Sequence, residues 1–570
     1  MTGFRWACRR GRVAGVAAVM ALALVGGAAL AQTHADHVRV EPTIPADEFG
    51  GAFDNGLQNA AVFAWNEFIA LNWPAKSGTR DSADPTQPFG VQTGPLVWET
   101  FRSKVEVYPG NGNATTPPHG GAGGYNDPPD YIYDPGTVHT QDGRIAACSG
   151  QAPGGPTAWI NLDETSELGV NQTFAGIVPA VDPSGRNSAP RLIRYAVKTD
   201  HVEYDYVVSP QSPYWYGARV KGSPLATAIA NYQSVAGKTP PVDPPAPFVE
   251  LPVGTIEVKS AWRPLAPGEN PRHFHTALVR YYEAGPTPGS FCYRQAVWGL
   301  VGMHIIHKTE SAPWFVWATF EQADNLRSAA GRPVEDAEGN LRVTTPELLY
   351  KDAASGPSLS ILGRYYCTAP GLRLYFRESA SFSGLPSGGD ICVDQRFSPI
   401  PSVVIAVNQE AHGAIDDYAA KHHVAESPWR YYKLVDVQPQ PFDKSQVDPA
   451  SGANASPGSF YTANAMIETD FSLGHFSGQI AANGVPTDYG PNGQPDFKNT
   501  VLLPFQGGGA RIPPVNMGGC SGCHAGNAAA GGTDFSFILG ASVTAPETPA
   551  TGVEQALPRL QRLRQLLLHR

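Results

Sequence analysis

Short segments rich in β-branched and aromatic residues follow one another through the middle of the chain, and they constrain the fold more than any other feature. Their alternation of side chains is typical of β-strands. Gly and Pro make up a fifth of the chain, which interrupts long helices and excludes a helix bundle or a coiled coil. The strand-like segments are 191–208, 254–264, 273–282, 296–307, 314–320 and 431–437.

A few helices are expected beside these strands. Residues 53–71 repeat apolar side chains at spacings of three and four, and 402–420 ends in a similar pattern. Most of 75–160 is instead expected to be loop, because of its Gly- and Pro-rich runs. The expected fold class is mainly β with some α, an α+β protein with a large loop-rich body.

The first 31 residues have the pattern of a secretory signal peptide. Four arginines precede an apolar stretch from Val13 to Gly27, and Ala29-Leu30-Ala31 is a small-x-small cleavage site. No other stretch is apolar enough to span a membrane, so no transmembrane segment is expected after cleavage. The net charge of −10 argues against a nucleic-acid partner, which needs basic patches. The sequence therefore predicts a periplasmic or secreted protein.

The motif Cys520-Ser521-Gly522-Cys523-His524 carries the clearest chemical signal. C-x-x-C-H is the attachment signature of c-type haem, in which two thiols bind the haem covalently and the histidine ligates the iron. A zinc site would need a second ligand pair, and a redox dithiol would need a βαβ context. Neither is near the motif. One covalent haem c is therefore expected, attached at Cys520 and Cys523, with His524 as the proximal iron ligand.

The sequence leaves the sixth iron ligand open. No Met follows His524 in the sequence, so a ligand is expected from upstream. Met466 and His304 are the first candidates and His475 is a further one, while an open or water-bound position is the alternative. A haem ligated by Met and His carries electrons, whereas a five-coordinate haem can bind small molecules and act as a catalyst.

Four further cysteines are expected to form disulfides, because the predicted compartment is oxidising. Cys367 and Cys392 flank a short segment and make the preferred local pair, which leaves Cys148 with Cys292. Four cysteines allow three pairings, so the other two stay open.

Other polar and aromatic residues have two interpretations each. Glu321 and Asp324 follow an aromatic strand, where both active-site residues and turn formers are common. Two histidine pairs could hold a second metal, although strand histidines usually have structural roles: His273 with His275, and His304 with His307. Four tryptophans could line a substrate pocket, although strand tryptophans usually pack in the core: Trp262, Trp298, Trp314 and Trp317.

The residue pattern divides the chain into four expected parts. These are the signal peptide (1–31), a β-rich body (32–440), a haem c-binding region packed on that body (441–545), and a linker with a basic amphipathic C-terminal helix (546–570).

Six segments together carry a family resemblance. They are AVFAWNEFIALNWPA (61–75), LVWETFRS (96–103), TIEVKSAWRPL (255–265), WGLVGMHIIHKTESAPWFVWATFEQADN (298–325), ANAMIET (463–469) and NMGGCSGCHAGNAAAGGTDFSFIL (516–539). They resemble a family of large secreted bacterial proteins with one C-terminal c-type haem motif, labelled cytochrome c family proteins. The resemblance implies haem at Cys520, Cys523 and His524 and a periplasmic location, and it implies no particular reaction.

The expected function is that of a periplasmic c-type cytochrome with one covalent haem, an electron-transfer role and a redox partner protein. The large β-rich body is more than a small electron carrier needs. Two alternatives therefore stay open. One is a haem enzyme, peroxidase- or oxygenase-like, with an open sixth iron position and a small-molecule substrate. The other is a haem-based redox or gas sensor. The sequence does not decide whether the protein is an enzyme.

Overall fold

A computed structural model gives the fold of the chain. It describes residues 37–47, 56–110, 121–151, 158–164, 172–174, 192–209, 224–235, 244–266, 268–327, 332–342, 362–366, 374–377, 390–396, 400–439, 464–467, 520, 524 and 532–539. These residues all belong to one compact unit that begins at Ala35.

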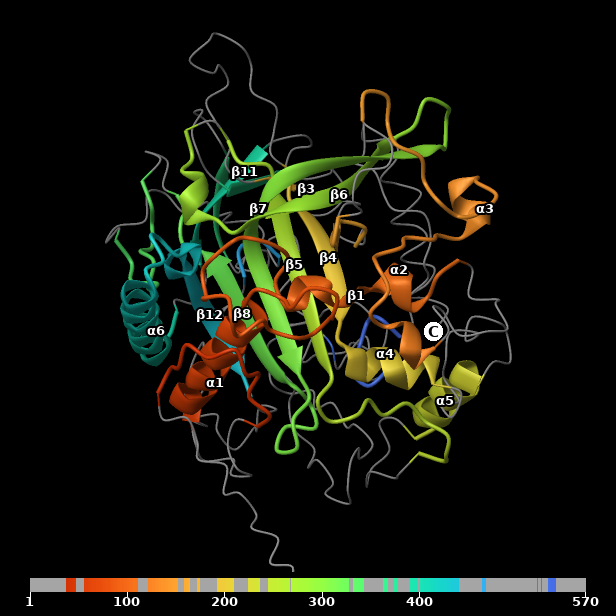
Figure 1. Ribbon diagram of the computed structural model, residues 1–570, viewed down its shortest axis with the longest axis horizontal. Helices are drawn as coiled ribbons and strands as arrows, with labels where there is room; N and C mark the ends of the chain where they lie inside the picture. Colours follow the sequence, from red (N-terminus) through yellow and green to blue (C-terminus); the bar gives the residue numbers. More distant parts are fainter. Residues whose placement is uncertain are drawn as a thin grey trace, which may run out of the picture. The chain divides into compact units, whose positions relative to one another are not determined.

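An eight-stranded sheet forms the centre of this unit (Figure 1). Six strands follow the order β1-β4-β5-β7-β6-β2, and β8 joins β12 to β7. All pairs are antiparallel except that of β2 with β6. The strands are β1 (Arg102–Ser103), β2 (Ile160–Asn161), β4 (Arg194–Thr199), β5 (Ile256–Arg263), β6 (Thr276–Ala284), β7 (Phe291–His307), β8 (Val316–Gln322) and β12 (Tyr432–Gln438).

The long strand β7 organises this sheet. At Gly299 it pairs with β5 on one edge and with β6 on the other. From Gly302 to His307 the second edge pairs with β8 instead. The sheet therefore forks along β7, and its β5–β7–β8 part carries the candidate site described below.

A second sheet has four antiparallel strands in the order β3-β10-β11-β9. They are β3 (Gln172–Phe174), β9 (Leu362–Tyr366), β10 (Leu374–Arg377) and β11 (Asp390–Arg396).

Two helices, α1 (Gly56–Leu71) and α6 (Ser402–His422), pack beside the β8–β12 part of the main sheet (Figure 1). The Phe320 ring of β8 stacks on Phe68 of α1 at 4.1 Å and meets the Trp65 ring edge-on at 5.2 Å. Large apolar rings on one face of the helix thus bury this face of the sheet.

The remaining helical elements are short. The α-helices are α2 (Lys104–Val107), α3 (Pro135–Val138), α4 (His201–Val208) and α5 (Pro224–Gln233). The 3₁₀ turns are Trp98–Thr100, Ala122–Gly124, Pro271–His273 and Pro428–Tyr431.

The α+β fold class is confirmed, and β5 to β8, β12, α1 and α6 lie where the sequence predicts them. The prediction of strands throughout 191–208 is wrong for its second half. After β4 the chain forms α4, because the Asp200 side chain accepts a hydrogen bond from the Glu203 N–H (3.2 Å) and caps the helix. This N-cap overrides the β-propensity of the valines and tyrosines that follow.

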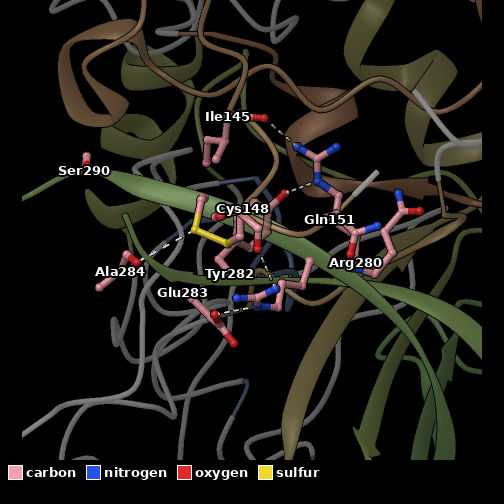
Figure 2. The surroundings of a disulfide bond; sticks show 12 residues. Ile145, Cys148, Gln151, Arg280, Tyr282, Glu283, Ala284 and Ser290 are labelled. Atoms are coloured by element: carbon pink, nitrogen blue, oxygen red, sulfur yellow. Dashed lines mark hydrogen bonds and ion pairs between the residues drawn. A yellow bond between two sulfur atoms is a disulfide. The ribbon is translucent and has the colours of Figure 1, made fainter. Parts of the chain in front are cut away.

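The disulfide between Cys148 and Cys292 is confirmed, with the Cα atoms 4.8 Å apart, and it ties a loop to the start of β7 (Figure 2). Beside it, the Arg280 guanidinium donates to the Tyr282 hydroxyl (3.0 Å) and the Ile145 carbonyl (3.4 Å). The proposed partner of Cys392, residue Cys367, lies outside the described residues. So do the predicted signal peptide and C-terminal helix. Among the helices that the structure describes, none is long and apolar enough to cross a membrane.

Candidate functional site

The candidate site lies on the face of the β5–β7–β8 sheet opposite to Phe320 and α1. Directly paired residues of antiparallel strands share a face. Lys259 of β5, His304 of β7 and Thr319 of β8 therefore form one row across this face. Trp317 of β8 lies two residues from Thr319 and projects from the same face.

His524 lies against this face. Its ring centroid is 4.4 Å from that of Trp317 and 4.5 Å from that of Phe537. The Nδ1 atom is 2.8 Å from the Phe535 carbonyl oxygen. Since a carbonyl only accepts, Nδ1 carries the proton, and Nε2 keeps a lone pair that can bind a metal.

Desolvation among these rings lowers the pKa of His524 to about 3, and the nearby Lys259 and His304 side chains add to the effect. The hydrogen bond to Phe535 acts in the opposite direction and does not reverse it. At neutral pH the imidazole is therefore uncharged, as a metal ligand must be.

Cys520 is half-buried and packs against the hydrophobic core. Cys520 and His524 each have helical backbone conformation. Cys523 lies outside the described residues. A half-buried thiol, an uncharged histidine with a fixed tautomer and surrounding aromatic rings fit a covalently attached haem.

Met466 lies on the same face of the sheet as His524. Asn464 anchors its segment, donating to the Thr319 hydroxyl at 2.9 Å and accepting from the Met466 N–H at 2.9 Å. The Tyr195 hydroxyl donates to the Met466 carbonyl at 2.8 Å. A Cβ on Gly302 of β7 would lie 3.2 Å from the Met466 Cβ, so a larger residue here would press on the Met466 segment. The structure therefore brings Met466, His304 and His524 to one face, whereas His475 lies outside the described residues.

A pair of buried glutamates lies beside the segment that holds His524. Glu203 of α4 accepts from the Thr199 hydroxyl at 2.7 Å and from the Ser536 hydroxyl at 3.4 Å. Burial raises the pKa of Glu203 to about 7, and burial with the Glu203 charge raises the pKa of Glu257 on β5. Two carboxyl groups in contact do not both ionise readily. The pair therefore retains a proton at neutral pH.

The members of each histidine pair lie in different surroundings. The His307 Nδ1 atom lies 2.8 Å from Glu67 Oε1 of α1, on the face away from His304. His275 contacts Glu99 at 2.7 Å, and His273 stacks on a tyrosine ring. Among the described residues, no group of three or more metal-ligating side chains comes together.

The other candidate residues have structural partners. Glu321 accepts a hydrogen bond from the Ala465 N–H and so helps to anchor the Met466 segment. Asp324 pairs with Arg327 at 3.3 Å in a turn. Trp317 is buried and contacts His524. The other three tryptophans are also buried: Trp262, Trp298 and Trp314.

Sequence patterns gave no sign of the residues that hold His524 in place. Phe535 supplies the carbonyl, and Lys308 at the end of β7 pairs with Asp534 at 2.7 Å. Lys308 is more than two hundred positions from His524 in the sequence, and only folding brings it near.

Comparison of the chain with family models, with curated proteins and with solved structures found no match.

Proposed function

We propose that the protein is a periplasmic c-type cytochrome that carries one covalent haem, transfers single electrons and works with a redox partner protein. Cys520 and Cys523 would hold the haem, and His524 would be the proximal iron ligand. When bound, the haem supplies one-electron redox chemistry.

The observation that carries this proposal is the state of the His524 ring. It is uncharged, packed against two aromatic rings, and held in one tautomer by the 2.8 Å hydrogen bond to the Phe535 carbonyl. Such an outer hydrogen bond orients a ligating imidazole and raises its basicity. This arrangement lies in a C-x-x-C-H motif, where a proximal ligand is needed.

The body residues have separate roles in this proposal. Trp317 restricts the His524 ring on the sheet side. Tyr195 and Asn464 fix the backbone of Met466. Met466 is the preferred sixth ligand, because a fully buried Met whose backbone is fixed on the same sheet face as His524 favours an electron carrier over an open site.

A haem enzyme or sensor with an open sixth position is the second candidate. The polar side chains of Lys259 and His304 on the same sheet face favour it, because polar groups near an iron support the binding of small molecules.

The test is to express the chain in a host with haem maturation and to denature the purified protein. Haem that stays with the denatured chain supports the proposal, and a chain without covalent haem overturns it. Cys520→Ser with Cys523→Ser should lose the haem. Cys148→Ser is the matched control, because it removes a cysteine of the disulfide and should keep the haem.

The reduced spectrum with and without carbon monoxide then separates the two candidates. An unchanged spectrum supports the electron carrier, and a shifted spectrum supports the enzyme or sensor. Met466→Ala should create carbon monoxide binding if Met466 is the sixth ligand, whereas His304→Ala should not.

A further inference from the structure

The carbonyl that holds His524 belongs to a turn with an unusual backbone. Asp534 and Phe535 have φ angles of 49° and 69°, in the left-handed region that residues with a Cβ rarely occupy. Two such residues in succession persist only where the surrounding contacts fix them. The contacts around this turn therefore decide whether the Phe535 carbonyl faces His524.

A buried ion pair fixes the turn to the body. Asp534 Oδ2 accepts from Lys308 Nζ at 2.7 Å and from the Leu251 N–H at 2.6 Å. The Lys308 and Asp534 side chains are 2 % and 0 % exposed, so water does not compete for the pair. The backbone of Lys308 is also fixed. Its N–H donates to the Thr255 carbonyl at 2.9 Å, and its carbonyl accepts from the Gly254 N–H at 2.7 Å. The lysine therefore links the turn to the chain directly after β7, a strand paired on both sides up to His307.

The other hydrogen bonds of the turn either join residues within it or are longer than the two bonds to Asp534. The Thr533 hydroxyl donates to the Ser536 carbonyl at 2.8 Å, and the Ser536 N–H donates to the Thr533 carbonyl at 3.0 Å. Ser536 also reaches Glu203 of the body at 3.4 Å. The two bonds to Asp534 are shorter, and the one from Lys308 joins two opposite charges.

We propose that Lys308 is a positioning residue for His524: its ion pair with Asp534 keeps the strained turn in place and so holds the Phe535 carbonyl against Nδ1–H. Without the pair, the turn relaxes toward ordinary backbone angles and the carbonyl rotates away. The effect on the His524 ring needs no cofactor. The effect on the midpoint potential of the haem rests on the proposed function.

Three variants test this role. Lys308→Met keeps the length of the side chain and removes its charge, and Lys308→Arg restores the charge. Lys433→Met is the matched control. Lys433 pairs with Glu335 at 2.7 Å, and both side chains are 1 % exposed. Lys433 lies opposite Glu321, four residues along β8 from Trp317, so its pair does not touch the turn.

The first measurement is the exchange rate of the His524 Nδ1 proton with solvent, from ¹⁵N NMR of the reduced full-length protein. Lys308→Met should exchange at least tenfold faster than wild type, and Lys308→Arg should stay within twofold. Lys433→Met loses a similar ion pair and should also stay within twofold. Unchanged exchange in Lys308→Met overturns the proposal, as does equal acceleration in Lys433→Met.

If Lys308→Met does not fold, Asp534→Asn takes its place. Asparagine keeps an acceptor for the Leu251 N–H and removes the negative charge with which Lys308 forms its ion pair. Exchange at the His524 Nδ1 should then rise at least threefold, and an unchanged rate overturns the proposal.

The second measurement is the midpoint potential of the haem-carrying protein. Loss of the Nδ1 hydrogen bond makes the imidazole less basic and favours the reduced state. Lys308→Met should shift the ratio of reduced to oxidised protein at least threefold, about 28 mV at 59 mV per tenfold for one electron. Lys433→Met should not shift it, and an equal shift in both variants overturns the proposal.

The two proposals fail in different ways. A chain without covalent haem overturns the proposed function, and the exchange rates still decide the role of Lys308. A haem-carrying chain with unchanged exchange in Lys308→Met keeps the proposed function and overturns this inference.

Discussion

The buried glutamate pair predicts that the protein loses stability as the pH rises from acidic to neutral. Glu203 and Glu257 are buried, and burial raises the pKa of Glu203 from 4.5 to about 7. The folded protein thus binds this proton more tightly than the unfolded chain does. The resulting stability is present in full below about pH 4.5 and is lost as the pH rises to about 7.

The size of the effect follows from the same pKa. One pKa unit corresponds to about 1.4 kcal/mol. A rise from 4.5 to about 7 therefore means that ionisation of Glu203 costs the folded state about 3 kcal/mol. Glu203→Gln keeps an acceptor for the Thr199 hydroxyl and cannot ionise. The variant should match wild type near pH 4.5 and exceed its free energy of unfolding by about 3 kcal/mol at pH 8.

The assay is urea unfolding of wild type and Glu203→Gln between pH 4.5 and 8. Burial also raises the pKa of Asp163 to about 7, so the difference between the two proteins is the quantity to compare. Asp417→Asn, an exposed change on α6, is the control and should follow wild type at every pH. Parallel curves for wild type and Glu203→Gln would contradict this prediction, because Glu203 would then have the same pKa in the folded and unfolded chains.

Three further predictions concern stability. Glu106 is fully buried between two arginines, which hold its pKa at about 2 against the effect of burial. Glu106→Gln should therefore lower the free energy of unfolding by about 3–5 kcal/mol. A loss below about 1 kcal/mol in urea unfolding would contradict this. Cys148→Ser with Cys292→Ser opens a loop with a sequence separation of 144 and should cost about 2–5 kcal/mol, measured against wild type without reductant. Gly302→Val should cost about 1–3 kcal/mol and loosen 464–467, because a Cβ there meets that segment at 3.1 Å. Amide exchange of 464–467 that stays as slow as in wild type would argue against this contact.

Local patterns predict most of the central sheet. Alternation in 254–264, 296–307 and 314–320 is enough to place β5, β7 and β8, because a strand's period of two is written in neighbouring residues. The failure at 191–208 has a local cause as well. The single capping side chain of Asp200 redirects the chain into a helix, and a strand pattern does not show that contact.

The sequence alone predicts haem chemistry at the candidate site, because Cys520, Cys523 and His524 form a C-x-x-C-H motif within five residues. It also indicates Met466 and His304 as candidates for the sixth iron ligand, because no Met follows His524 and a ligand would come from upstream. The tertiary structure decided what surrounds that motif. Strand register puts His304 and Trp317 on one face of the sheet, and Lys308 meets Asp534 across 226 positions of the chain. Register and long-range ion pairs depend on how the whole body packs, so no local pattern carries them.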